Sequence, residues 1–291
     1  ARAGQIESRP NSLATVNVVL RFPNRSAISQ DIQGGNPMSA SSVVRIQGIV
    51  VAVALTGMAF AWPDPPQEQV NKKPSTYASA KALEYQLVYL MDRLEDDLED
   101  EGKFDRRAKR IVRDASTIAA LALVMGKHDE ANGVGARAGG IIRAANALAA
   151  NANSHADAAA AYAKLVASCQ APTTQPVEWK CVADIEQLML QVPQLNTSLK
   201  SNTKASRFDT SREKAAGLAA ALAAVAQVSM FDQSYCDGPV EHAEWVGLCV
   251  QMRDSAHGVY KVIQDGNVEA VESAMQPLSR SCDDCHEKFR D

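Results

Sequence analysis

Cys282-Asp283-Asp284-Cys285-His286 is the most informative stretch of this 291-residue chain, because it puts a specific motif on the last helical segment and so narrows the fold. Cys-x-x-Cys-His is the attachment signature of a c-type haem, in which two thiols bind the haem vinyl groups and the histidine ligates iron. A dithiol redox site would need a neighbouring βαβ pattern, and zinc would need two more ligands at suitable spacing. We therefore predict one covalent haem c on Cys282 and Cys285, with His286 as the proximal iron ligand.

The apolar pattern outside the motif is helical. Apolar side chains recur every three or four residues in two well-separated segments, and alanine is abundant between residues 78 and 170. No convincing run of strand-like alternation is present, so the pattern predicts an all-α chain. The two apolar stripes are Leu83, Leu87, Leu90, Met91, Leu94 and Leu98, and Ile185, Leu188, Met189, Val192, Leu195 and Leu199.

The helical segments form two sets of four. The first set covers about 78–101, 106–125, 135–151 and 154–169, and the second covers about 182–200, 210–230, 240–264 and 267–290. We predict a helical bundle without a haem motif over 78–169, a linker over 170–180, and an antiparallel four-helix bundle that binds haem over 181–291. In the first set Pro172 and Thr173 occupy the places equivalent to Cys285 and His286, so it cannot attach haem in the same way. One larger helical domain is the alternative.

Three local signals mark helix starts. Capping boxes are expected at Ser154, with Asp157 in the acidic place, and at Thr210, with Glu213. Pro277 is expected where the haem-bearing helix begins, because a proline at a helix start loses no hydrogen bond.

The N-terminal part resembles an export signal. Met38 opens a polar stretch with Arg45, and an apolar run over 49–61 ends in Ala59-Phe60-Ala61, which is typical of a cleavage site. The run is shorter than the roughly 20 residues that span a membrane. We expect an upstream extension over 1–37 that is disordered or not native, a signal peptide over 38–61, a proline-rich linker over 62–77, and a periplasmic or otherwise exported protein without a membrane span once the signal is removed. The net charge of −4 gives no indication of nucleic-acid binding.

The C-terminal half, about 180–291, resembles the class II c-type cytochromes, the cytochrome c-prime family. The likeness is strongest from Ala274-Met275-Gln276-Pro277 through the motif to Phe289-Arg290, and Trp245 matches a tryptophan often found in the third helix of the family. The resemblance implies a four-helix bundle with haem on the last helix, and often a homodimer. It also implies that Trp245 and Arg290 surround the haem, although a solvated terminal arginine explains Arg290 nearly as well.

The second iron ligand is implied by the same resemblance. Met189 falls where the low-spin branch of the family has its ligand methionine, although a methionine on an apolar stripe is more often a core residue. Pro193, four residues further on, is expected to kink or stop the helix there.

The other four cysteines permit disulfides in an oxidising compartment. Pairing Cys169 with Cys181 and Cys236 with Cys249 closes short loops and is the preferred arrangement, and free buried thiols are the alternative.

The sequence thus predicts an exported electron carrier that passes single electrons to redox partner proteins and is not an enzyme. A five-coordinate haem protein that binds small gases such as nitric oxide or carbon monoxide is one alternative. A haem-containing interaction or sensor module is the other.

Overall fold

The structure is a computed structural model that describes residues 67–173 and 176–289. These residues belong to one compact unit. The upstream extension over 1–37, the signal peptide over 38–61 and Arg290 lie outside the described residues, so those assignments stay predictions.

The described part of the chain contains nine α-helices and no strand, which confirms the all-α prediction. Eight of the helices correspond to the eight predicted segments. They are α2 (Ala80–Leu98), α3 (Phe104–Gly126), α4 (Ala138–Ala150), α5 (His155–Ser168), α6 (Ile185–Asn202), α7 (Phe208–Ser229), α8 (Pro239–Gln264) and α9 (Val268–Phe289). The ninth is the short α1 (Gln67–Val70), which the sequence analysis assigned to the linker over 62–77.

Ser154 is the N-cap of α5 as expected, but Asp157 pairs with its hydroxyl and not with its backbone N–H, so the capping box is only partly formed. Ser154 accepts a hydrogen bond from the Asp157 backbone N–H (3.2 Å) and donates its hydroxyl proton to the Asp157 carboxylate (2.7 Å) at the start of α5. The Thr210 prediction was wrong, because α7 already begins at Phe208 and the Thr210 hydroxyl donates to the carbonyl of Arg207 at 3.0 Å.

Both prolines lie inside helices. α6 continues past Pro193 to Asn202, so of the two outcomes expected there, a kink or a stop, the stop does not occur. α9 begins at Val268, nine residues before Pro277, so Pro277 does not mark its start. A proline removes one backbone hydrogen bond, and the buried apolar residues on both sides of each proline keep these helices continuous: Leu188 and Leu195 in α6, and Met275 and Leu278 in α9.

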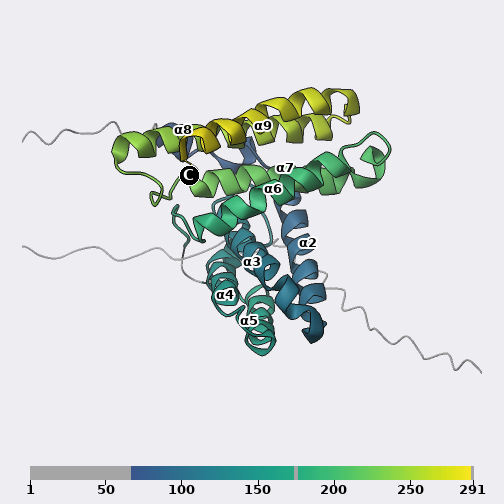
Figure 1. Cartoon of the computed structure of the whole chain (residues 1–291), viewed down its shortest axis with the longest axis vertical. Coiled ribbons are helices and arrows are strands. Elements are labelled where there is room, and N and C mark those ends of the chain that lie inside the picture. The colour runs from purple at the N-terminus through teal and green to yellow at the C-terminus, as the bar shows by residue number, and fades with distance from the viewer. Residues whose placement is uncertain (1–66, 174–175, 290–291) are drawn as a thin grey trace, which may run out of the picture. The chain divides into compact units, whose positions relative to one another are not determined.

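Successive helices pack on each other in both halves of the chain (Figure 1). α6 packs on α7, α7 on α8, and α8 on α9, while α3 packs on α2 and α4, and α4 on α5. The two halves meet where α2 and α3 contact α7 and where α3 contacts α6. Every residue from Ala215 to Ser229 in α7 is buried, as is every residue from Asp114 to Met125 in α3. Their many alanines allow close approach on all sides, so these two helices form the centre of the core.

A buried polar cluster joins the two halves. Arg93 of α2 donates to Asp114 of α3, with 2.6 Å between Nε and Oδ2. Gln191 of α6 donates from Nε2 to Oδ1 of the same carboxylate at 3.1 Å. The side chain of Asp114 has no exposed surface, so the cluster fixes the position of α6 against α2 and α3.

None of the described helices is both long enough and apolar enough to cross a membrane.

Candidate functional site

A cavity of about 140 Å³ lies between α6, α7, α8 and α9. α9 contributes Ser281, Cys282, Cys285 and His286 to its wall. The remaining wall residues are mostly apolar, with Asn196 and Ser229 as the polar ones: Met189, Val192, Pro193, Asn196, Ala226, Ser229, Trp245, Leu248, Cys249 and Met252. The structure therefore brings the predicted haem-binding residues of α9 to one cavity, together with Met189 and Trp245.

The two motif thiols face this cavity from a partly buried position on α9. Burial, and then the neighbouring Cys282, raise the pKa of the Cys285 thiol to about 11. Burial, and then the carboxylate of Asp283, raise the pKa of Cys282. Both groups are therefore neutral thiols near pH 7, which suits packing against an apolar ligand.

His286 differs from the other four histidines in its hydrogen bonds. His286 is exposed at the rim of the cavity and has no hydrogen bond or ion pair within the described residues. In each of the other four a ring nitrogen lies against a backbone carbonyl: His128 with Ala78 (3.0 Å), His155 with Leu98 (2.7 Å), His242 with Met230 (3.1 Å) and His257 with Tyr77 (3.0 Å). His286 is thus the histidine of the described chain with both ring nitrogens free to bind a metal.

Met189 lines the cavity from α6, so His286 and Met189 reach the same space from two different helices. Met252 of α8 also lines it, which the sequence analysis did not predict. Its helical spacing from Trp245 and Cys249, at seven and three residues, was the available signal. The cavity therefore offers two thioethers, and sequence position alone does not choose between them.

Trp245 closes the cavity on the α8 side and is buried. Its Nε1–H donates to the carbonyl of Ser229 at 2.7 Å, which ties α8 to the end of α7. Phe289 packs edge-on against the indole with 5.4 Å between ring centroids, and Tyr235 stacks on it at 5.9 Å. The phenylalanine that follows the motif thus anchors the end of α9 to α8.

All six cysteines are free thiols, so the preferred disulfide pairing was wrong. Cys181 donates to the carbonyl of Ala183 at 3.2 Å, whereas Cys169 is buried at the end of α5. Cys249 is buried in the cavity wall, where burial, and then Cys285 and Cys236, raise its pKa well above the usual value. Short loops in the sequence did not bring these sulfur atoms together.

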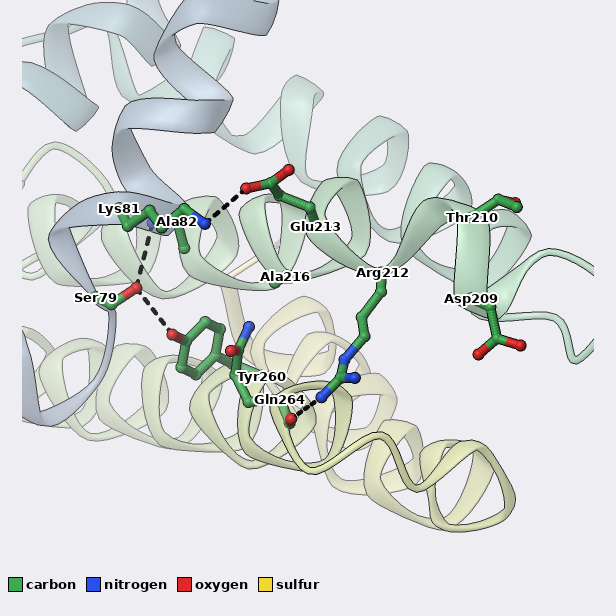
Figure 2. A pocket seen from close by; sticks show the side chains of 10 residues that line it. All are labelled: Ser79, Lys81, Ala82, Asp209, Thr210, Arg212, Glu213, Ala216, Tyr260 and Gln264. Carbon is green, nitrogen blue, oxygen red and sulfur yellow. Dashed lines mark hydrogen bonds and ion pairs between the residues drawn. The ribbon is translucent and has the colours of Figure 1, made fainter.

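A second, larger cavity of about 460 Å³ lies where the starts of α2 and α7 meet the end of α8 (Figure 2). Figure 2 shows that its polar groups pair with one another: Tyr260 donates to Ser79 at 2.8 Å, and Lys81 pairs with Glu213 at 3.0 Å. Arg212 donates from Nε to the carbonyl of Ile263 at 2.9 Å. This cavity has no cysteine or histidine in its wall, so it offers no haem attachment.

Within the described residues, no group of three or more histidine, cysteine, aspartate or glutamate side chains could hold a metal ion. Haem iron needs only axial ligands from the protein, because the porphyrin supplies the others. Two thiols, a free imidazole and a thioether around an apolar cavity are therefore a donor set that fits haem.

Comparisons of the chain with protein-family models, with curated proteins and with solved structures found no match. The resemblance to the cytochrome c-prime family therefore rests on the motif and its flanking residues, and it remains a proposal.

Proposed function

We propose that this protein is an exported c-type cytochrome that carries one covalent haem and transfers single electrons to partner proteins without acting as an enzyme. In this proposal α6 to α9 form a four-helix bundle of the cytochrome c-prime type. One observation carries it: the thiols of Cys282 and Cys285, the unengaged imidazole of His286 and the thioether of Met189 all line one apolar cavity.

A planar cofactor would enter where these four helices are least closely packed. The cavity of about 140 Å³ is close in size to one that holds a single benzene ring, so a haem would require α6 and α9 to move apart. α6–α7, α7–α8 and α8–α9 are closely packed pairs, whereas α6 and α9 are not among the closely packed pairs of the described helices. The cavity lies where α6 and α9 face each other. A haem ring inserted there displaces little direct helix–helix packing and meets apolar side chains on both faces.

Each residue then has a separate role. Cys282 and Cys285 would hold the haem through thioether bonds, and His286 of α9 would bind its iron. Met189 of α6 would supply a second iron ligand, and thioether ligation raises the reduction potential, which suits electron transfer. Bound haem supplies the one-electron chemistry, and the apolar wall keeps water from the iron.

Optical spectra of the exported, purified protein test the proposal. We expect a low-spin ferrous spectrum that carbon monoxide changes little, and a Met189→Ala variant that becomes high-spin. Met252→Ala is the matched control, because Met252 lines the same cavity from α8. If only Met252→Ala becomes high-spin, the ligand comes from α8 and the Met189 assignment is wrong.

Two other results would favour a different function. A high-spin spectrum that shifts strongly with carbon monoxide in the parent protein would indicate open iron and the gas-binding alternative. A folded, exported protein without haem would refute the cytochrome proposal and favour an interaction or sensor module. The mass of the mature chain checks export as well, because we expect cleavage after Ala61 and the added mass of one haem.

A further inference from the structure

Asn196 is an unexplained polar group in the haem cavity. Asn196 lines the cavity wall on the α6 side, two turns after Met189. Its Oδ1 atom is buried and has no hydrogen-bond partner within the described residues. A buried polar atom without a partner weakens the folded state. Because no hydrogen bond holds this carboxamide in one orientation, it can turn and present its Nδ2 donor to a ligand.

Lys200 lies one turn after Asn196 on the same face of α6. It is exposed and has no ion pair within the described residues, unlike Lys72, Lys81, Lys103 and Lys288, which all pair with carboxylates. Burial is the main cause that raises the pKa of the Cys282 thiol, and the ammonium of Lys200 opposes that rise. Lys200 does not itself line the cavity, but its long side chain starts one turn beyond Asn196, which does.

An amide and an unpaired ammonium thus follow each other along α6 beside an otherwise mostly apolar cavity. This arrangement suits a ligand with an apolar body and a carboxylate at one edge. Haem has that chemistry, because its ring is apolar and its two propionates are carboxylates. When the carboxamide turns so that Nδ2 faces the cavity, it can donate a hydrogen bond to such a carboxylate.

We propose that Asn196 and Lys200 bind a propionate of the haem, Asn196 through a hydrogen bond from its amide and Lys200 through its charge. The assignment rests on the proposed function, since it concerns the orientation of the haem in the same cavity. It adds a carboxylate-binding pair to the residues that attach the ring and ligate the iron.

Reversible haem binding tests this pair. The full-length chain with Cys282→Ala and Cys285→Ala serves as the parent, because it cannot form thioether bonds. It is titrated with ferric haem and with haem dimethyl ester, in which both carboxylates are capped. We expect haem to bind about tenfold more tightly than the ester, since hydrogen bonds to charged groups are the stronger ones. Asn196→Leu and Lys200→Met should each remove most of that preference. Gln194→Leu, an exposed position of α6 outside the cavity, should leave it unchanged.

The stability of the haem-free chain gives a second readout. Asn196→Leu should unfold at the same urea concentration as the parent or a higher one, because leucine removes the unpaired atom. Equal binding of haem and ester by the parent would overturn the carboxylate-binding pair and leave the cytochrome proposal standing. Failure of the parent to bind either compound would overturn the carboxylate-binding pair as well, whereas an exported protein with both cysteines intact but no haem would remove the proposed function itself. Variants that keep the tenfold preference while losing stability would show that both residues are only structural.

Discussion

Replacing Asp114 by alanine tests how the first half of the chain supports the haem cavity. Asp114 accepts hydrogen bonds from Arg93 on α2 and from Gln191 on α6. Gln191 is two residues from Met189, so the carboxylate holds the helix that carries the proposed iron ligand. In the Asp114→Ala variant, the guanidinium of Arg93 and the amide of Gln191 lose the carboxylate to which both donate.

The expected loss of stability follows from the burial of the pair. Removing one partner of a buried ion pair costs about 3–5 kcal/mol. The side chain of Asp114 has no exposed surface, whereas that of Arg93 keeps 25% and can regain water. We therefore expect the lower end of the range, about 3 kcal/mol. A chain of this size loses roughly 2–4 °C of melting temperature per kcal/mol, so Tm should fall by roughly 10 °C.

Urea unfolding followed by circular dichroism measures the effect. Replacing both charges with apolar groups, as in Arg93→Met with Asp114→Leu, should restore most of the loss because no unpaired charge remains. Asp100→Asn is the control, since its ion pair with Lys103 is on the surface and should give no measurable change. A midpoint for Asp114→Ala equal to that of the parent would refute the argument that this cluster positions α6.

Three further predictions concern the pH dependence, the cavity wall and the helix contacts. Burial lowers the pKa of His257 below its usual 6.5, so its contribution to stability is present above pH 6.5 and is lost as the pH falls through the lowered value. His257→Gln should therefore flatten the fall in unfolding free energy between about pH 7 and 5; an unchanged slope would contradict this. Trp245→Phe should lower the free energy of unfolding in urea by about 1 kcal/mol, because the hydrogen bond to Ser229 is lost. Trp245→Ala should lower it by about 3–5 kcal/mol, because the buried ring is lost as well. Equal losses of unfolding free energy in the two variants would show that the ring does not contribute. An added Cβ at Gly126 would lie 2.6 Å from a side-chain carbon of α4, so Gly126→Ala should destabilise the protein by about 1–3 kcal/mol. Gly258 lies in the interior of α8 with open space around it, so Gly258→Ala should stabilise the protein by about 0.5–1 kcal/mol. Thermal melts that rank the two variants in the reverse order would refute this description of the packing.

The helices could be predicted from the sequence almost to their ends. Apolar spacing and alanine content act between residues three and four apart, and those neighbours are present in the sequence itself. Ser154 was confirmed as the N-cap of α5 for the same reason. α6 does not stop at Pro193 and α9 does not start at Pro277, because both helices bury apolar side chains on either side of the proline. Tertiary packing of this kind is absent from a local pattern.

The site could be predicted only in part. The motif named Cys282, Cys285 and His286, and the structure places all three at one cavity. It also places Met252, Asn196 and Cys249 there, which the sequence analysis did not predict as cavity residues. A methionine or an asparagine inside an amphipathic helix gives no local sign of the cavity that it faces. The disulfide prediction failed in the same way, because loop length does not determine where two sulfur atoms point.

The helical class, the eight long segments and the motif on the last of them follow from local sequence. The central place of α3 and α7 in the core, and the cavity between α6 and α9, became visible only in the packed structure. The packed structure also distinguishes His286, which has both ring nitrogens free among the described residues, because the carbonyls that engage His128 and His257 belong to residues 50 and 180 positions away. Helix formation depends on near neighbours in the chain, whereas hydrogen-bond partners and cavity walls depend on contacts that exist only after the helices have packed.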